Sequence, residues 1–385
     1  MRIAIPREVV AGETRVAIIP EMLPLMIRDK HQVVVETGAG HGAGFSDDEY
    51  VEAGAVIVSQ PQALYEDSDL VIKVQPPAMH SSLQRHEAEL IPEAATYIGF
   101  LAPLANRELI KMLMERKITA FSVEYIPRIT RAQSMDVLSS MSTVAGYKAV
   151  LLATGRMRKM IPLLMTAAGT IPPATFLILG AGVSGLQAIA TAKRLGAKVE
   201  AFDPRPLVRE QVKSLGASFV EMEMPEDVET AGGYAKEQSE QFLEKEREAI
   251  RARLPRVDVV ISTAQVFGKR APVLLTEAMV RDLRPGSVIV DLAAEQGGNC
   301  ELTKAGETIE RHGVSIMGPV NLAATVPVDA SRMYSKNVTT LFKHLYPKPG
   351  VMPDFADEIV KGCCITRAGE IVNAQISTAL SRETG

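Results

Sequence analysis

The sequence contains no tryptophan and only three cysteines among its 385 residues. Three cysteines cannot form a disulfide framework, and the adjacent Cys363 and Cys364 do not have the spacing of metal ligands. We therefore expect no metal site. The simplest interpretation of these two residues and of Cys300 is buried free thiols in a reducing compartment.

Long hydrophobic runs and a leader sequence are also missing. No apolar run approaches the ~18 residues of a membrane span, and the nearest candidate, residues 94–104, contains a glycine and a proline. The N-terminus lacks the basic start, apolar stretch and cleavage site of a signal peptide. The 42 basic and 46 acidic residues give a net charge of −4 without a basic cluster. We therefore expect a cytoplasmic protein that has no membrane span of its own and does not bind nucleic acid.

The chain does contain short apolar strands that alternate with segments of helical periodicity. This alternation predicts an α/β fold with mostly parallel sheets. Strands are expected in the first half at residues 2–5, 32–36, 70–74, 96–101 and 118–123, and in the second half at 175–179, 198–202, 218–220, 258–262, 287–291 and 315–317. Apolar residues at helical spacing over 134–157 predict a long helix that connects the two halves.

The C-terminal part of the chain is expected to return to the first half. Residues 330–344 have a helical pattern, and a terminal helix needs an apolar partner. The predicted domains are therefore one lobe of residues 1–133 and 327–385 and a second lobe of residues 134–326. Residues 221–256 carry many charges and no strand signal, which is typical of a functional flap or an exposed helix over 235–253.

The strongest motif is the hexapeptide Gly180-Ala181-Gly182-Val183-Ser184-Gly185, which fits the pattern G-x-G-x-x-G. It follows an apolar strand and opens a helical segment, the context that a dinucleotide site requires. Gly180 permits the tight turn, Gly182 lets a pyrophosphate approach the backbone, and Gly185 lets the helix pack closely on the strand. The free N–H groups at the helix N-terminus attract phosphate. This motif predicts a dinucleotide site.

Asp203 ends the next strand, about 20 residues after the last glycine of the motif. A carboxylate there accepts hydrogen bonds from the adenosine ribose hydroxyls and repels a 2′-phosphate, so it favours NAD(H) over NADP(H). Arg205, two residues further on, weakens this preference because an arginine is able to hold a phosphate. A second glycine motif, residues 38–43, precedes Asp47, Asp48 and Glu49; these acids are unsuited to an anion site, and we interpret the motif as a loop.

A general base for alcohol or amine oxidation is difficult to find in this sequence. None of the six histidines follows a predicted strand at an expected cleft. Lys73 is a possible base or carboxylate ligand, and Arg15 is a possible ligand for a small acid. A structural ion pair explains each of them equally well.

The junction between the two halves combines arginine, glutamine, aspartate and serine over residues 127–140. An arginine such as Arg128 can clamp a phosphate or carboxylate, and Gln133 offers a donor and an acceptor that suit a nicotinamide carboxamide. The alternative is that Ser134 or Asp136 only caps the following helix. Both interpretations remain open on the residues alone.

Several sequence blocks carry a specific resemblance: PRITRAQSMDVLSS at 127–140, TAAGT at 166–170, QAIATAKRLGA at 187–197, AGGYAK at 231–236 and DLAAEQGGNC at 291–300. They resemble the NAD(H)-binding component, domain I, of proton-translocating nicotinamide nucleotide transhydrogenase. The resemblance covers essentially the whole chain. It implies two Rossmann-like lobes and a homodimer. The implied reaction is direct hydride transfer from NADH to NADP⁺ on a separate domain III, coupled to proton movement by a membrane-spanning subunit.

By the same resemblance, the chain is a peripheral subunit on the inner face of the plasma membrane, active only with its partners. The residues implied at the nicotinamide end are Arg128, Ile129, Thr130, Gln133, Asp136 and Ser139. The mobile loop that closes over nucleotide corresponds to Gly233 and Tyr234, and the remaining NAD(H) contacts correspond to Asp203, Pro204, Arg205, Gln265 and the glycine motif. Direct hydride transfer between two nicotinamides needs no general base, because positioning the rings and excluding water are the main tasks.

Two alternatives remain. In an alanine dehydrogenase, which resembles this chain, Arg15 and Lys73 would correspond to the substrate-binding pair. The catalytic histidine of that family would fall near Phe100, and its active-site aspartate would fall at Glu295. A related saccharopine-type enzyme fits less well. A binding module that senses NAD would keep the glycine turn and Asp203 but would not need Gln133 or Tyr234.

Overall fold

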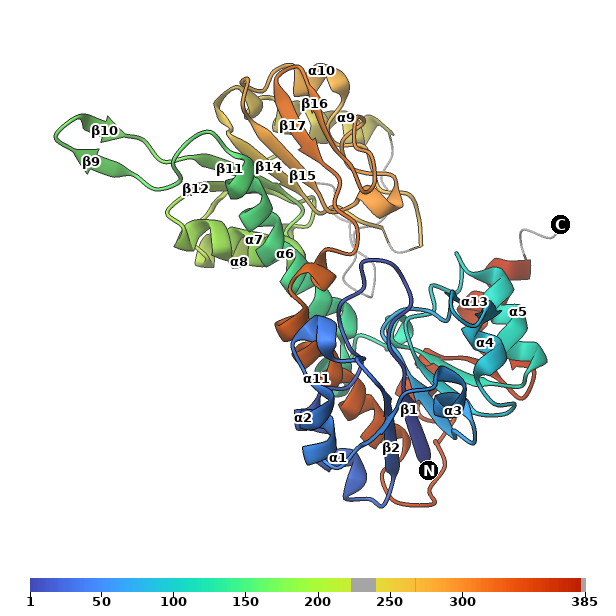
Figure 1. Ribbon diagram of the computed structural model, residues 1–385. Helices are drawn as coiled ribbons and strands as arrows, with labels where there is room; N and C mark the ends of the chain where they lie inside the picture. Colours follow the sequence, from blue (N-terminus) through green and yellow to red (C-terminus); the bar gives the residue numbers. More distant parts are fainter. Residues whose placement is uncertain (223–239, 267, 382–385) are drawn as a thin grey trace. The chain divides into compact units, whose positions relative to one another are not determined.

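The computed structural model describes residues 1–222, 240–266 and 268–381, and the chain divides into two compact units. Unit 1 contains Met1–Met141 together with Ala323–Gly385, and unit 2 is the continuous segment Ser142–Leu322. Each unit has a large sheet with helices on its faces (Figure 1). This α/β architecture confirms the predicted fold class. The domain boundaries at 133/134 and 326/327 stay a prediction.

Unit 1 is built on an eight-stranded sheet of order β19-β18-β8-β7-β4-β1-β2-β3. Its strands are β1 (Arg2–Ile5), β2 (Gln32–Glu36), β3 (Val56–Val58), β4 (Leu70–Ile72), β7 (Thr96–Gly99), β8 (Thr119–Ser122), β18 (Cys364–Arg367) and β19 (Glu370–Ile371). All neighbours are parallel except β8/β18 and β18/β19. A small hairpin of β5 (Met79–His80) and β6 (Arg85–His86) stands apart from this sheet.

The helices of unit 1 connect these strands or return from unit 2. They are α1 (Pro24–Ile27), α2 (Asp47–Glu52), α3 (Pro61–Tyr65), α4 (Glu87–Leu90), α5 (Arg107–Glu115), α11 (Pro327–Leu345), α12 (Glu358–Cys363) and α13 (Ala374–Ser381). Pro327 starts α11, where a missing N–H costs nothing. Val338, Leu341 and Phe342 of α11 are completely buried. The predicted return of the C-terminal segment to the first half is therefore confirmed.

Unit 2 has a seven-stranded sheet of order β13-β12-β11-β14-β15-β17-β16, antiparallel only at β16/β17. Its strands are β11 (Thr175–Leu179), β12 (Lys198–Phe202), β13 (Ser218–Phe219), β14 (Val259–Ser262), β15 (Val288–Asp291), β16 (Thr308–Arg311) and β17 (Val314–Met317). Its helices are α7 (Val183–Arg194), α8 (Arg209–Ser214), α9 (Glu240–Arg251) and α10 (Glu277–Val280). The central strands are continuous apolar runs because both sheet faces are covered.

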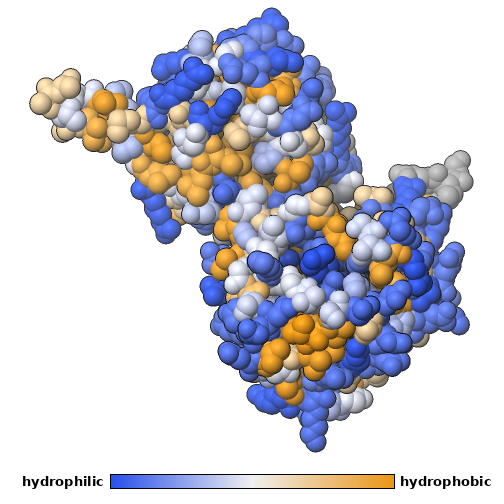
Figure 2. Space-filling view, in the orientation of Figure 1, coloured by the Kyte–Doolittle hydropathy of each residue, from blue (hydrophilic) through white to orange (hydrophobic). Residues whose placement is uncertain are grey.

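A two-stranded hairpin, β9 (Leu164–Thr166) and β10 (Gly169–Ile171), lies outside the unit 2 sheet. It extends away from the sheet in Figure 1. Met165 is 72% exposed and the neighbouring Leu163 55%, whereas Leu164 is half-buried. Figure 2 shows hydrophobic residues among those of the projecting hairpin. The sequence analysis did not predict this hairpin.

The long helix α6 (Val137–Arg156) connects the two halves, close to the predicted range of 134–157. By length and hydropathy it is the one helix in the described parts of the chain that is able to cross a membrane. This corrects the expectation that residues 94–104 were the nearest candidate: serines, threonines and one lysine interrupt the apolar residues of α6. Core helices of soluble proteins have the same length and composition.

Gly146 of α6 lies against the first turn of α7. A Cβ at position 146 would lie 2.1 Å from the carbonyl oxygen of Ser184, a backbone atom that cannot turn aside as a flexible side chain could. Gly146→Ala is therefore expected to destabilise unit 2 by about 2 kcal/mol, because the two helices must separate. Thermal and urea unfolding measure this, with Gly155→Ala as the matched control: position 155 has open space, so an alanine there should not destabilise. Equal effects of the two changes would contradict the close approach.

Candidate functional site

The strand order of unit 2 reverses between β11 and β14, so a crevice is expected at the carboxyl ends of these strands. The glycine motif leaves β11 at this position. Gly180 has φ +95°, and a Cβ on Gly185 would lie 1.9 Å from the Gly180 carbonyl oxygen. Gly182 caps α7 in an extended conformation. Val183 and Ser184 form the first turn of α7, so the predicted strand–turn–helix context is present.

The Asp203 carboxylate follows β12 at the same edge and is buried. Its Oδ2 accepts a hydrogen bond from the Ala181 N–H at 2.6 Å, which ties the carboxylate to the glycine turn. Arg205 donates its backbone N–H and Nε to Oδ1, each at 2.9 Å, and its Nη2 to Oδ2 at 2.8 Å. Pro204, between them, is half-buried. The structure thus places the predicted ribose acceptor, Asp203, beside the glycine turn, and Arg205 is hydrogen-bonded to its carboxylate.

These residues fit a dinucleotide. The N-terminus of α7 provides the N–H groups and partial positive charge that bind a diphosphate. Among the described residues, a Cβ on Gly182 would meet a single atom within 4 Å, the Nη2 of Arg205 at 3.9 Å. The described chain therefore leaves space in front of the turn, as the approach of a pyrophosphate requires.

Glu246 of α9, which was not among the predicted site residues, is a buried carboxyl group near Asp203. Burial, together with the negative charge of Asp203, raises the pKa of Glu246 to about 7, and Arg247 acts in the opposite direction. No sequence pattern signalled this, because α9 and β12 are far apart along the chain. Glu246 therefore changes its charge in the neutral pH range, close to the predicted ribose site.

Glu246→Gln is expected to stabilise unit 2 at alkaline pH. A carboxyl group whose pKa is raised on folding favours the folded state below the unfolded pKa of 4.5, and this advantage is lost as pH rises through 7. An amide at this position does not ionise, so the variant avoids this loss of folding free energy. The expected gain is on the order of 2 kcal/mol at pH 8 and much less at pH 5. Calorimetric melting at both pH values measures it, with the exposed Glu248→Gln as control. A pH-independent difference would contradict the assignment.

The loop after β14 completes this edge of unit 2. Thr263 donates its hydroxyl to the Gly180 carbonyl at 3.1 Å, and the exposed Gln265 donates its amide to the Leu292 carbonyl at 2.9 Å. Asn299 holds Ala264 by two hydrogen bonds, Ala264 N–H to Oδ1 at 3.0 Å and Nδ2 to the Ala264 carbonyl at 2.8 Å. The predicted cofactor residue Gln265 therefore lies on a loop that is fixed in place.

Asp291 explains why the sequence DLAAEQGGNC forms a defined loop. The carboxylate of Asp291 is completely buried and accepts five hydrogen bonds. The donors are the hydroxyls of Ser262 and Thr303 and the backbone N–H groups of Ala293, Asn299 and Cys300. This carboxylate organises the loop, and the sequence analysis did not identify that role.

The remaining predicted residues lie in unit 1, in and beside the short helix η4 (Thr130–Met135) that precedes α6. Asp136 caps α6: its carboxylate accepts the Ser139 backbone N–H at 2.9 Å and hydroxyl at 2.6 Å. Asp136 therefore caps α6, and its role toward a ligand stays a prediction. Gln133 is exposed, and its side chain makes no hydrogen bond to any part of the chain that the structure describes. Arg128 and Thr130 are exposed, and Ile129 is half-buried.

Contacts within unit 1 anchor η4. Ala132 and Met135 are buried, and the buried Asn337 of α11 donates to the Ser134 carbonyl at 2.8 Å. Arg131 pairs with Asp357 at 2.7 Å. Burial alone would raise the pKa of Asp357, but hydrogen bonds from His344 and Arg131 hold it well below its usual range. The helix η4 is thus held by contacts to the rest of unit 1, while the side chain of Gln133 is exposed to solvent.

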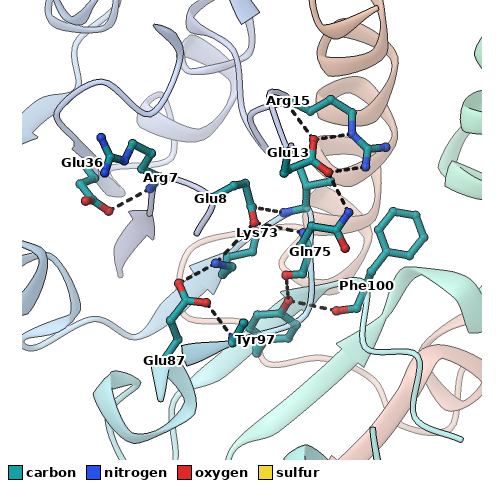
Figure 3. A network of polar contacts seen from close by, with 12 residues as sticks. Arg7, Glu8, Glu13, Arg15, Glu36, Lys73, Gln75, Glu87, Tyr97 and Phe100 are labelled. Atoms are coloured by element: carbon teal, nitrogen blue, oxygen red, sulfur yellow. Dashed lines mark hydrogen bonds and ion pairs between the residues drawn. The ribbon is translucent and has the colours of Figure 1, made fainter. Parts of the chain in front are cut away.

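The strand order of unit 1 also reverses, between β1 and β4, but this edge is filled by side chains of the protein itself (Figure 3). Lys73 follows β4, is completely buried, and lies 2.5 Å from Glu87 and 3.4 Å from Glu8. Burial alone would lower the pKa of Lys73, but the two carboxylates raise it. A lysine that stays protonated does not accept a proton, so the ion-pair interpretation of Lys73 is supported over a general base.

Arg15 is likewise engaged by an internal carboxylate (Figure 3). Its Nε and Nη2 donate to the two oxygens of Glu13 at 2.8 and 2.6 Å, and Gln75 donates to the same carboxylate at 2.7 Å. Burial raises the pKa of Glu8 to about 7, against the attraction of Lys73. The cations that would bind a small acid are therefore paired with internal glutamates, which were not predicted from the sequence.

The second glycine motif is not a phosphate site in this structure. Asp47 accepts the Gly38 N–H at 2.8 Å and the Thr37 hydroxyl, so a carboxylate occupies the donors that an anion would need. The pocket there has a volume of about 590 Å³ and is lined by Asp47 and Asp48 among others. The loop interpretation of this motif is therefore supported.

The structure thus brings the glycine motif, Asp203, Pro204, Arg205 and Gln265 to one edge of unit 2, and Arg128, Ile129, Thr130, Gln133, Asp136 and Ser139 to one segment beside α6. Gly233 and Tyr234, predicted as the closing loop, lie outside the described residues. Of the predicted helix over 235–253, the described portion is α9. The three cysteines are free and buried, as expected.

Two family profiles match the chain: the N-terminal domain of alanine dehydrogenase/PNT over residues 4–145 and the C-terminal domain over residues 149–374. A relative from Rhodospirillum rubrum, named as the first part of NAD(P) transhydrogenase subunit alpha, is 46% identical over 98% of this chain and 99% of its own length. Alanine dehydrogenase 2 of Staphylococcus aureus is 30% identical over the whole chain and 97% of its own length. The crystal structure of a transhydrogenase from Sinorhizobium meliloti superimposes with a TM-score of 0.85 at 38% identity, covering 96% of this chain and all of that one. The chain therefore belongs to the alanine dehydrogenase/PNT family and is a homologue of the transhydrogenase alpha subunit.

Proposed function

We propose that this chain is the peripheral NAD(H)-binding subunit of a proton-translocating transhydrogenase. NADH binds at the β11/β14 edge of unit 2, with its diphosphate at the N-terminus of α7 and its adenosine ribose at Asp203. The nicotinamide passes a hydride directly to NADP⁺ on a separate domain III, and a membrane-spanning subunit couples the transfer to proton movement. A homodimer on the inner face of the plasma membrane completes the proposal, and the exposed apolar hairpin β9–β10 is consistent with a protein–protein contact.

The observation that carries this proposal is a contrast between two positions where the strand order of a sheet reverses. One lies at the carboxyl ends of β11 and β14 in unit 2, and the other at the carboxyl ends of β1 and β4 in unit 1. The unit 2 edge has space before Gly182 beside an anchored ribose acceptor. The unit 1 edge is filled by ion pairs, and its two candidate cations for a small acid, Lys73 and Arg15, are bound to internal glutamates. Such a chain is suited to one dinucleotide and to a reaction whose second substrate comes from another protein. In that reaction Gln133, Arg128 and Asp136 position the nicotinamide.

A second candidate is an alanine dehydrogenase, because of the relative from Staphylococcus aureus. Two features of unit 1 disfavour it. The histidine expected of that enzyme falls near Phe100, whose ring packs on Tyr334 at 5.9 Å and has no proton to exchange. Lys73 and Arg15 are paired with the chain's own carboxylates.

A mixing assay tests the proposal. The purified chain is combined with an isolated transhydrogenase domain III that carries NADP(H), and transfer between NADH and an optically distinct NAD⁺ analogue is followed. We expect rapid transfer that requires both proteins. Absence of transfer together with NADH oxidation on pyruvate and ammonium would assign the chain to the amino-acid dehydrogenases instead. NADH binding without either reaction would leave only an NAD-sensing module.

A further inference from the structure

Arg205 occupies hydrogen-bonding positions on the Asp203 carboxylate that the hydroxyls of an adenosine ribose would need. Two atoms of its guanidinium and its backbone N–H donate to the Asp203 carboxylate, while the Ala181 N–H takes a further position on Oδ2. The pair is largely withdrawn from water, with 3% of the Asp203 side chain and 11% of the Arg205 side chain exposed. A ribose diol therefore reaches this carboxylate only if the guanidinium moves.

The guanidinium also borders the phosphate turn. Among the described residues, its Nη2 is the one atom within 4 Å of the position that a Cβ on Gly182 would take, at 3.9 Å. The same cation thus lies between the predicted ribose acceptor and the predicted diphosphate position. Rotation about its side-chain torsions moves the guanidinium without breaking the hydrogen bond of the backbone N–H to Asp203.

We propose that Arg205 is a two-position residue that makes the site selective for adenosine ligands carrying a diphosphate. Before nucleotide binds, its guanidinium donates hydrogen bonds to both oxygens of the Asp203 carboxylate and blocks access to them. When a dinucleotide binds, the ribose hydroxyls take over the carboxylate and the guanidinium moves to the diphosphate. This inference rests on the proposed NAD(H) site in unit 2 and adds the means by which that site chooses its ligand.

The selectivity follows from the balance of charge-assisted hydrogen bonds. Adenosine replaces a buried guanidinium–carboxylate pair by neutral hydroxyl donors and deprives the cation of this carboxylate, which is costly. ADP or NADH performs the same replacement but supplies two phosphate charges to the displaced cation. The presence of an arginine two residues after Asp203 is then compatible with NAD(H), because the diphosphate engages the guanidinium that a 2′-phosphate would otherwise attract.

The test compares adenosine with ADP on wild-type protein, Arg205→Met and Arg205→Lys. Affinities are measured by calorimetry and by displacement of bound NADH, which is followed by its own fluorescence. For Arg205→Met we expect adenosine to bind severalfold more tightly and ADP about tenfold more weakly, with a smaller salt dependence for ADP. Arg205→Lys should retain more of the ADP affinity than Arg205→Met.

Arg209→Met is the matched control, because Arg209 is an exposed arginine of the same segment that pairs with Glu221. It should leave both affinities unchanged, and thermal unfolding verifies that every variant folds. Equal weakening of adenosine and ADP by Arg205→Met, or an unchanged ratio of the two, would overturn the two-position role while NADH binding by the wild type still supported the dinucleotide site. Failure of the wild-type chain to bind NADH would overturn both.

Discussion

Gln133→Asn is expected to slow hydride transfer to domain III about 100-fold while NADH affinity changes less than twofold. The side chain of Gln133 is exposed and makes no hydrogen bond to the described residues, although the helix that carries it is anchored by Asn337 and by Arg131. Removing one methylene withdraws the amide by about 1 Å, and displacements of this size cost about two orders of magnitude when a group positions reacting atoms.

Single-turnover transfer in the mixing assay measures the rate, and NADH fluorescence titration measures the affinity. Gln62→Asn, at an exposed glutamine of α3 in the same unit, serves as control and should change neither quantity. Melting temperatures should be equal for all three proteins, because the side chain of Gln133 makes no hydrogen bond to the described residues. A loss of affinity as large as the loss of rate would mean that Gln133 binds NADH and does not position its nicotinamide.

Asp203→Asn is expected to weaken NADH binding about 30-fold, or roughly 2 kcal/mol. The amide keeps an oxygen for the Ala181 N–H but loses the negative charge and one of the two acceptors for the ribose hydroxyls. Without the negative charge of the carboxylate, a 2′-phosphate is no longer repelled at this position. NADPH affinity should therefore rise as NADH affinity falls, and the ratio of the two is the most sensitive readout.

Asp258→Asn is the matched control, since Asp258 precedes β14 at the opposite edge of the same sheet, where it pairs with Lys159 at 2.9 Å. It should lower stability without changing the preference between the two nucleotides. NADH affinity unchanged by Asp203→Asn would remove Asp203 from the site. A loss of NADH affinity without any gain for NADPH would mean that the charge of Asp203 is not what disfavours NADPH.

Local sequence patterns predicted the elements whose apolar residues are continuous. The ranges of β1, β2, β11 and β12 agree with the predicted strands, because each is a short run of buried apolar side chains between turn residues. The hairpin β9–β10 was missed because its apolar residues face solvent. Strand β18 was missed because its register depends on β8, which lies in the first half of the chain, far from β18 in sequence.

The site shows the same division between local and non-local information. The glycine motif and Asp203 were identified because a turn, a helix start and a strand end are local features. Glu13, the ion-pair partner of Arg15, is close to it in sequence, but the burial of this ion pair is visible only in the fold. Glu246 approaches Asp203 from a helix that is distant in sequence, so its raised pKa was beyond sequence reasoning.

The assembly of unit 1 from two separate segments has a consequence for synthesis of the chain. Unit 2 is continuous and is complete when Leu322 has been added, whereas the sheet of unit 1 lacks β18 and β19 and the cover of α11 until Ala323–Gly385 follows. On the ribosome, unit 2 is therefore expected to fold first. Until Ala323–Gly385 follows, Met1–Met141 remains incompletely folded, with the β8 edge unpaired and apolar side chains exposed. Chaperone dependence and sensitivity to C-terminal truncation should accordingly concentrate in the half of the protein that is made first.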